Sequence, residues 1–357
     1  MNWELVFNKP LPSWMCGGGP DSDIVLSSRV RLARNLSGVP FPGRASKEQL
    51  NGVLNRLHQL PERLQELDGT PYYLFEMEQL SLLQRMVLVE KHVVSPQYAA
   101  EPAQRALLVR EDTGASVMIN EEDHLRMQCM TAGLDLETVL QQADRLDDAI
   151  EAETDMAFTE NLGYLTSCPT NLGTGLRASA MLHLPALVIT RQVGRIVAVA
   201  TQLGLAVRGL YGEGTEAVGN VFQISNQLTI GYSEQEIIGK LNSVVRRIVD
   251  RERSARQLLV AESIDSLADR VWRAYGILCY ARSLTGQEAL TLLSEVRLGI
   301  DAGIINQVPA EVFNELLVTT RPNYLQKMLG ETELDSKIVD RLRSDLVRKK
   351  LGGKEDV

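Results

Sequence analysis

Short apolar runs bounded by turn residues mark the first two thirds of the chain. Residues 106–109 and 117–119 are apolar, and the strand-like runs 106–109 and 116–119 are separated by a turn-like stretch at 111–114, which predicts a β-hairpin. Residues 221–224 and 228–230 predict a second hairpin. Apolar residues then recur at helical spacing, at Ile237, Leu241, Val244, Val245 and Ile248. Hairpins mixed with helices favour an α+β fold, with an antiparallel sheet flanked by helices, over a doubly wound parallel sheet.

The pattern becomes helical throughout near the end of the chain. One helical face carries Ile264, Leu267, Val271, Tyr275 and Leu278. Thr285 and Glu288 resemble a capping box that opens the next helix. We therefore expect three parts: an extended N-terminal lead-in at 1–22, rich in Pro and Gly, a mixed domain at 23–255, and a helical C-terminal domain at 256–357.

Composition limits the classes of protein. The 357 residues, 44% of them hydrophobic, are enough for a full core. We find no run near the roughly 18 apolar residues of a membrane span, and the start of the chain does not resemble a signal peptide, so we expect a cytoplasmic protein. The four cysteines form no CxxC pair, which argues against a disulfide framework or a zinc site. A net charge of -9 argues against nonspecific nucleic-acid binding.

Two adjacent carboxylates, Glu121 and Glu122, follow the predicted strand at 116–119. A pair of this kind is usually a solvated acidic turn. The alternative is a clamp for the planar donors of an arginine. Because the pKa of arginine lies above ~12, freeing a lone pair at neutral pH costs roughly 7 kcal/mol at ~1.36 kcal/mol per unit. A carboxylate that accepts this proton would make the guanidinium a nucleophile.

Cys168 stands among turn formers, with a glycine-rich stretch after it that ends at Arg177. A single cysteine is usually a small buried residue. In the alternative, nearby cations lower the pKa of the thiol, and a thiolate faces a guanidinium. The glycines could let backbone amides approach phosphate, although the sequence contains no Walker A motif and no HRD or DFG motif.

Arginines recur beside these segments, at Arg29, Arg31, Arg126, Arg177 and Arg208. Arg29 and Arg31 would share one face of a strand. Together such arginines form a clamp that spreads positive charge over a transferring phosphoryl group. His92 and His124 have no metal-ligand spacing, so we expect structural or nucleotide-contacting roles and no protein-bound metal. The combination predicts phosphoryl transfer to arginine.

Four motifs resemble those of the ATP:guanidino phosphotransferase family, which includes arginine kinase and creatine kinase. They are SRVR at 28–31, NEEDHLR at 120–126, CPTNLGTGLR at 168–177 and a substrate loop at 207–216. The resemblance implies the phosphagen kinase catalytic domain at 23–255. Within the family the chain is similar to the bacterial protein arginine kinases, because SRVR begins at Ser28, without the helical domain that phosphagen kinases place before it.

The resemblance also implies roles for residues. The guanidinium would meet Glu121, Glu122, Cys168 and a loop carboxylate, either Glu213 or Glu216. Tyr211 replaces a loop arginine of the phosphagen kinases. The implied ATP contacts are Ser27, Ser28, Arg29, Val30, Arg31, His92, Arg126, Arg177, Ala178, Ser179, Ala180, Met181, Arg208, Gly209, Leu210, Tyr211, Gly212 and Glu213.

In the helical domain the resemblance implies a regulatory phosphoarginine pocket at Asp340, Arg341 and Arg343. Val339 stands in place of the first arginine of the RDxxRA motif, so we expect weaker activation by phosphoarginine. Further implications are ATP with Mg²⁺ held by its phosphates, a homodimer, protein substrates bearing arginine, and a stress and proteolysis context with the repressor CtsR, the adaptor McsA and the unfoldase ClpC as partners.

Three alternatives stay open. The first is a kinase of free guanidino compounds, against which the short N-terminal segment argues. The second is a deiminase-like enzyme, which would need a nucleophile and a general base but no phosphate clamp. The third is a noncatalytic regulator that binds phosphoarginine. The sequence leaves open which protein arginines are targeted and whether an activator is needed.

Overall fold

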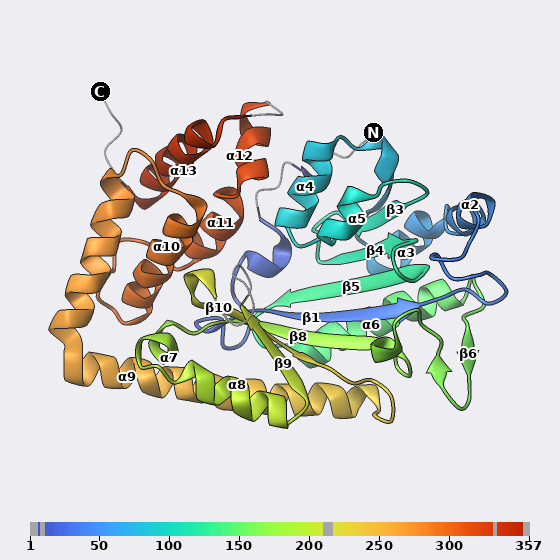
Figure 1. Ribbon diagram of the computed structural model, residues 1–357, viewed down its shortest axis with the longest axis horizontal. Helices are drawn as coiled ribbons and strands as arrows, with labels where there is room; N and C mark the ends of the chain where they lie inside the picture. Colours follow the sequence, from blue (N-terminus) through green and yellow to red (C-terminus); the bar gives the residue numbers. More distant parts are fainter. Residues whose placement is uncertain (1–5, 8–10, 210–216, 331–333, 353–357) are drawn as a thin grey trace.

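The computed structural model describes residues 6–7, 11–209, 217–330 and 334–352. Its centre is an eight-stranded antiparallel sheet with the order β2-β3-β4-β5-β1-β8-β10-β9, shown in Figure 1. The strands are β1 (Val25–Arg34), β2 (Tyr72–Glu76), β3 (Ala106–Arg110), β4 (Ala115–Ile119), β5 (Leu125–Ala132), β8 (Leu176–His183), β9 (Leu205–Gly209) and β10 (Val221–Asn226). A small hairpin pairs β6 (Phe158–Thr159) with β7 (Gly163–Tyr164). The predicted α+β class with an antiparallel sheet is confirmed.

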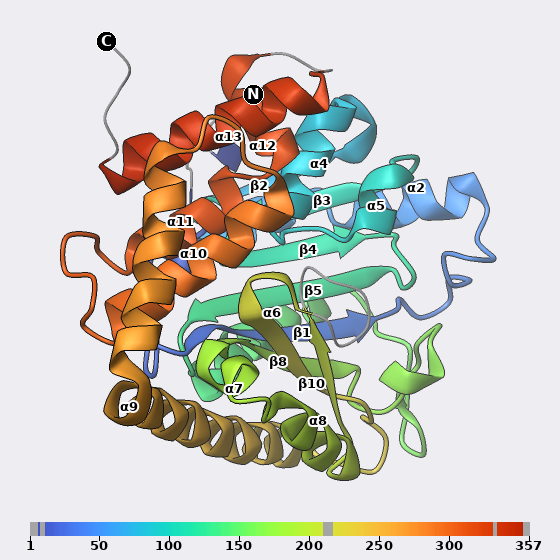
Figure 2. The same cartoon turned by 60° about the vertical axis from the view of Figure 1, so that its left-hand side comes forward.

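Helices surround this sheet and form the C-terminal part of the molecule. Around the sheet lie α2 (Lys47–Arg56), α3 (Leu60–Asp68), α4 (Leu82–Glu90), α5 (Pro96–Ala100), α6 (Leu136–Glu151), α7 (Pro185–Ile189) and α8 (Val193–Gln202). The long helix α9 (Glu234–Tyr280) leads to α10 (Gly286–Asp301), α11 (Glu311–Thr319), α12 (Pro322–Leu329) and α13 (Ser336–Leu351), which gather at one end of the sheet (Figure 2). None of the helices in the described ranges is both long and apolar enough to cross a membrane.

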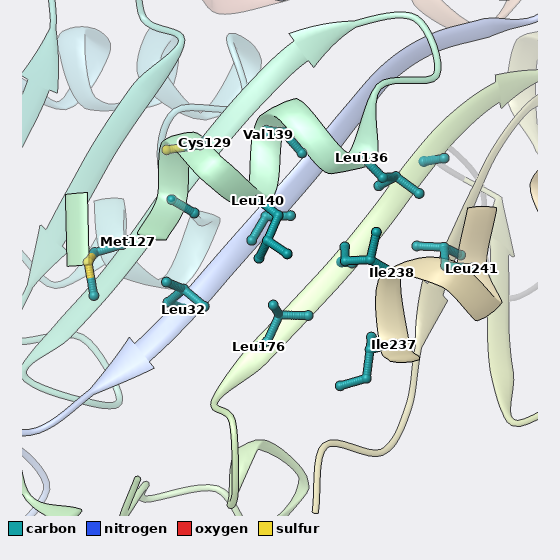
Figure 3. Close-up of a cluster of buried hydrophobic side chains, with 14 of the residues drawn as sticks. Leu32, Met127, Cys129, Leu136, Val139, Leu140, Leu176, Ile237, Ile238 and Leu241 are labelled. Atoms are coloured by element: carbon teal, nitrogen blue, oxygen red, sulfur yellow. The ribbon is translucent and has the colours of Figure 1, made fainter. Parts of the chain in front are cut away.

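Alternation along the strands gives the sheet one apolar and one polar face. Val30 and Leu32 of β1 are fully buried against α6 and the first turns of α9, whereas Arg29 and Arg31 point to the opposite face. Figure 3 shows this core, in which strand and helix side chains interdigitate: Leu32, Met127, Cys129, Leu136, Val139, Leu140, Leu176, Ile237, Ile238 and Leu241. The core fixes the strands and leaves the polar face open to ligands.

Of the two hairpins predicted from the sequence, one is present in the structure and the other is not. The first is confirmed, since β3 pairs with β4. The second is wrong, because β10 pairs with β8 and β9 and the chain after it does not fold back as a strand. Asn226 instead donates to the Leu176 carbonyl at 3.0 Å, and the Thr229 hydroxyl donates to the Leu172 carbonyl at 2.6 Å. These bonds tie residues 226–229 to the loop after Cys168.

The lead-in and α9 join the two parts of the chain. Trp14 and Met15 form a single 3₁₀ turn and are 1% exposed, within a second core built mainly from the helical domain and α4. The described lead-in is therefore packed and is not wholly extended as predicted. Helix α9 runs for 47 residues across the predicted boundary at 255, with a kink at Ser263. One helix thus belongs to both parts.

A buried ionic cluster closes the seam between the parts, and we call it the seam cluster: Glu252 and Arg256 of α9 with Arg297 and Asp301 of α10. Arg256 Nε donates to Glu252 at 2.9 Å and its Nη1 donates to Asp301 at 3.0 Å. Arg297 Nε also donates to Asp301, at 2.9 Å. Glu252 accepts the backbone N–H groups of Ala186 and Leu187 as well. Each charge in the seam cluster has an opposite partner.

Candidate active site

Arginines from three adjacent strands converge on the polar face of the sheet. Arg29 and Arg31 come from β1, Arg126 from β5 and Arg177 from β8, and Arg31 lies directly opposite Arg177 in the strand register. We call these four residues the sheet-face arginines. The pattern of alternate positions places them on one face because every second side chain of a strand points the same way. Strand pairing thus brings together the four arginines that were predicted to form a phosphate clamp.

Neutral groups supply most of the hydrogen bonds to the sheet-face arginines. Arg29 donates to Ser179 Oγ at 3.2 Å and to Gln223 Oε1 at 2.8 Å. Arg177 donates to Ser225 Oγ at 3.4 Å. The buried Nε atoms of Arg31 and Arg177 have no hydrogen-bond partner among the described residues. Hydroxyl and amide groups orient the guanidinium groups without neutralising them.

Burial and mutual repulsion lower the pKa values of the sheet-face arginines. Burial, and then the nearby Arg126 and Arg177, lower the pKa of Arg29 to about 10. Burial and the other sheet-face arginines hold the pKa of Arg31 well below its usual value, and only Glu121 opposes this. Arg208, an exposed residue of β9, contributes to the lowered pKa of Arg177. Such an excess of positive charge would be relieved by a bound polyanion.

Three of the sheet-face arginines, Arg29, Arg31 and Arg126, border a cavity of about 460 Å³. Its other walls come from α4, the segment before α5 and the helical domain, and include Val89, Val94, Met118, Arg321 and Pro322. A volume in this range suits a nucleotide-sized ligand, with apolar walls for a base and cations for phosphates. We call this space the sheet-face cavity.

His92 lies in the wall of the sheet-face cavity and is neutral. Burial, followed by repulsion from Arg29, lowers its pKa to about 3. Its ring meets Trp14 edge to face at 5.8 Å, and its carbonyl accepts a hydrogen bond from Gln128 at 2.9 Å. His92 therefore lines the cavity, and its contact with a nucleotide stays a prediction.

The turn between β4 and β5 presents the two glutamates in different settings. Glu121 pairs with Arg126 and accepts a hydrogen bond from the Ser95 hydroxyl, so both contacts hold it beside the phosphate side. Glu122 is exposed, and burial and the neighbouring Asp123 raise the pKa of its carboxyl. A carboxylate with a raised pKa accepts a proton more readily. Glu122 is thus the more accessible of the two carboxylates, and its role as proton acceptor stays a prediction.

Buried polar residues beneath this turn give it a fixed shape. Asp123 accepts hydrogen bonds from Asn35 Nδ2 at 2.6 Å and from the Ser167 N–H at 2.7 Å. His124 Nδ1 accepts the Leu36 N–H at 3.1 Å, which leaves Nε2 to donate to the Pro40 carbonyl at 3.1 Å. His124 is therefore structural, one of the two roles expected for it.

Cys168 lies next to the glutamate turn. Its neighbour Ser167 donates its hydroxyl to the Glu122 carbonyl at 2.8 Å, which joins the two segments. The thiol is partly exposed, lies 3.0 Å from Thr170 Oγ1 and is close enough to Arg177 for their charges to interact. Glu122 and Cys168 therefore stand together at one end of the sheet-face arginines. A guanidinium at this end would face both groups.

The other residues predicted to contact ATP lie in different places, and only some of them face the polar side of the sheet. Ser179 and Arg208 face the polar side, whereas Val30, Ala178 and Ala180 lie in the core and Met181 packs in the second core. Ser28 donates to the Gly133 carbonyl at 2.8 Å, Ser27 is buried beside it, and Gly209 ends β9. Leu210, Tyr211, Gly212, Glu213 and Glu216 lie outside the described residues.

Several residues of the site were not predicted from the sequence. Gln128, Gln223 and Ser225 lie on the polar face, and the alternation along β5 and β10 could have identified them. Arg321 comes from the start of α12, and no local pattern connects it to the sheet. His183 lies in the seam between the parts, with Nε2 2.7 Å from Ser294 Oγ.

The expected phosphoarginine residues lie on α13. Arg343 is buried and donates to the carbonyls of Thr320 at 2.8 Å and Leu284 at 2.6 Å, and it pairs with Asp340 at 2.5 Å. Arg341 is exposed, and Val339 is buried. In this structure Arg343 thus connects α13 to the neighbouring helices.

Comparison with known proteins agrees with this site. Residues 53–255 match the family model described as ATP:guanido phosphotransferase, C-terminal catalytic domain, and residues 264–356 match the protein-arginine kinase McsB C-terminal domain. A crystal structure of lombricine kinase is 28% identical, with a TM-score of 0.58 over 73% of each chain. The fold and site define an ATP:guanido phosphotransferase.

Relatives over the full length refine this class. The protein-arginine kinases of Bacillus subtilis and Desulforamulus reducens are 49% and 46% identical, each over 98% of this chain and over 96% and 98% of their own length. That of Moorella thermoacetica is 49% identical over 95% of this chain and 97% of its own. The chain therefore belongs to the protein-arginine kinase family.

Proposed function

We propose that this protein transfers the γ-phosphoryl group of ATP to the guanidinium of arginine side chains in other proteins. The observation that carries the proposal is the charge arrangement of the polar face. Sheet-face arginines with a single carboxylate partner among the described residues, Glu121, stand next to Glu122 and Cys168. A triphosphate fits the first group and a guanidinium fits the second.

The reaction follows from this arrangement. A guanidinium nitrogen attacks the γ-phosphorus, the bond from phosphorus to the bridging oxygen breaks, and ADP leaves with that electron pair. Glu122 accepts the proton that the attacking nitrogen loses. The sheet-face arginines stabilise the charge on the equatorial phosphate oxygens. Cys168 as thiolate, together with Glu213 or Glu216, would orient the guanidinium.

Mg²⁺ fits this site as part of the nucleotide. Within the described ranges no group of three or more His, Cys, Asp or Glu side chains could hold a metal ion. The arginine-rich face would repel a free cation, so the β and γ oxygens of ATP would be its ligands. When bound, the ion neutralises developing phosphate charge. The chain's own residues then need only bind the phosphates.

The relatives' name supports protein substrates over free arginine. We extend the proposal to a cytoplasmic homodimer that serves the stress response and marks proteins for proteolysis, with CtsR, McsA and ClpC as partners. The match of residues 264–356 to a domain specific to these kinases supports this extension. For phosphoarginine sensing, we propose Arg341, because Arg343 already holds backbone carbonyls.

The proposal is tested with purified protein, Mg·ATP and casein, followed by mass spectrometry under conditions that preserve acid-labile phosphate. We expect phosphoarginine on casein and very little on free arginine added at equal concentration. Preferred phosphorylation of free arginine would favour a kinase of small guanidino compounds. Citrulline formed without ATP would favour a deiminase, and binding of phosphoarginine without any turnover would favour a regulator.

A further inference from the structure

The far end of the sheet-face cavity is built partly by the helical domain. Arg321 and Pro322, at the start of α12, line the cavity together with Arg29 and Arg31. Helix α12 lies beside α4 in Figures 1 and 2, so a segment distant in the sequence reaches the catalytic face. The site is therefore shared between the two parts of the chain.

The strand register gives the order of groups along the site. Arg126 stands opposite Ala33, Arg31 opposite Arg177, and Arg29 opposite Ser179, so Arg29 is the sheet-face arginine farthest from the Glu122 turn. The helical domain, with α12, stands at the end of the sheet where β1 begins (Figure 1). Arg321 thus lies toward the Arg29 end of the cavity, opposite the transfer site.

The walls at this end suit a nucleoside better than a phosphate. They include Val89 and Pro322, and the nearby His92 is uncharged. A guanidinium over such a wall offers a flat surface for stacking on an aromatic base and donors for its ring nitrogens or the ribose. If the γ-phosphoryl group lies at Glu122, the rest of the nucleotide extends toward Arg321.

Hydrogen bonds to a carboxylate of the catalytic part fix the position of Arg321. Glu90, the last residue of α4, accepts the Asn323 N–H at 3.0 Å, the Asn323 side-chain amide at 2.7 Å and the Tyr324 N–H at 2.8 Å. These are the first free amides of α12, where a carboxylate is favoured by the helix dipole. These hydrogen bonds hold the start of α12 in place, and with it Arg321, the residue that immediately precedes the helix.

We propose that Arg321 of the helical domain binds the nucleoside moiety of ATP, and that Glu90 acts as its positioning residue. The inference rests on the proposed function for the direction in which ATP lies. It means that the catalytic domain alone lacks part of its nucleotide site. Nucleotide binding and the docking of α12 on α4 would then favour each other.

The test compares two probes on the full-length protein by calorimetry: Mg·ATP and Mg·tripolyphosphate, which has the phosphates but no nucleoside. Arg321→Ala should weaken Mg·ATP about tenfold and leave Mg·tripolyphosphate unchanged. Arg321→Lys should restore little of the Mg·ATP affinity that Arg321→Ala loses, since lysine lacks the planar guanidinium group. Arg273→Ala, an exposed arginine of α9, is the matched control and should change neither affinity.

Glu90→Gln should lower the affinity for Mg·ATP in the wild-type background and cause no further loss of affinity in the Arg321→Ala background. A further loss in that background would show a merely structural role. Unchanged ATP affinity in Arg321→Ala, or equal losses for both probes, would overturn the inference. Because these measurements need no acceptor protein, wild-type binding of Mg·ATP without phosphoarginine formation would count against the proposed function alone.

Discussion

The sheet face and the seam cluster use arginine in opposite ways. In the seam cluster, Arg256 and Arg297 each meet a carboxylate within 3.0 Å, and the residues involved are nearly inaccessible to solvent. On the sheet face only Arg126 has a carboxylate partner among the described residues, and burial followed by repulsion lowers the pKa of Arg29 and Arg31. Paired charges hold the fold together, whereas unpaired ones are available to a charged ligand.

A third region shows the reverse imbalance. Asp144, Asp147 and Glu234 lie around Arg34, which pairs with Asp147 at 2.5 Å and stacks 3.5 Å from the Tyr164 ring centre. One Asp147 oxygen is buried without a hydrogen-bond partner among the described residues. Here the excess is negative, and proton uptake by Glu234 can relieve it. The seam cluster is balanced, whereas the other two regions differ in the sign of the charge that they lack.

The largest effect on stability should come from the seam cluster. Arg256→Met leaves Glu252 and Asp301 buried with too few partners, so the free energy of unfolding should fall by about 3–5 kcal/mol. Arg253→Met on the same helix is the matched control, because Arg253 forms exposed pairs and should cost less than about 1 kcal/mol. Urea denaturation measures both. Equal losses would contradict the role of buried pairing.

The largest effect on catalysis should come from Glu122. Glu122→Gln keeps the shape of the side chain but cannot accept a proton, so phosphoryl transfer to casein should fall by at least about 100-fold. Affinity for Mg·ATP should stay unchanged, as the phosphates meet other residues. Glu160→Gln, on the exposed turn between β6 and β7, serves as control. Transfer near the wild-type rate would remove Glu122 from the mechanism.

A smaller effect is expected for a single sheet-face arginine. Arg177→Ala removes one charge-assisted phosphate contact and should weaken both Mg·ATP and Mg·tripolyphosphate about tenfold. Added salt should narrow the difference from wild type, since screening weakens the remaining contacts less than the original set. Calorimetry at two ionic strengths checks this. Unchanged affinity for both ligands would show that the phosphates lie elsewhere.

The smallest effect concerns pH. Burial, and then the neighbouring Asp144, raise the pKa of Glu234 to about 7. The folded protein thus holds a proton that the unfolded chain releases near pH ~4.3. The resulting stability is complete below that pH and is lost as the pH rises to about 7. Glu234→Gln should reduce the fall of the unfolding free energy between about pH 4 and pH 7, measured by urea denaturation, while the exposed Glu262→Gln should not. If the unfolding free energy of Glu234→Gln fell with pH as steeply as that of wild type, Glu234 would be excluded as the source.

The sequence predicted those parts of the site that strand alternation determines. Arg29 and Arg31 were placed on one face from their spacing alone, and the hairpin at 106–119 follows from local contacts. The second hairpin failed because Asn226 and Thr229 bind Leu176 and Leu172, which lie fifty and 57 residues earlier in the chain. Such contacts leave no periodic pattern in the sequence.

Two other features depend on how distant parts of the chain pack together. Arg321 reaches the sheet-face cavity only because α12 lies on α4, and Glu90 holds it there. Helix α9 continues past residue 255, since its apolar positions switch from one core to the other along a single helix. Helical periodicity predicted both halves of this helix but not that they are joined.

The most direct test of the charge comparison is the unfolding free energy of Arg31→Met with and without Mg·tripolyphosphate. Without ligand, the variant should be at least as stable as wild type, because a repelled cation is removed. With ligand at about 100 times its dissociation constant, wild type should gain about 2.7 kcal/mol and the variant much less. A variant that loses several kcal/mol without ligand, and gains as much as wild type with it, would contradict the account.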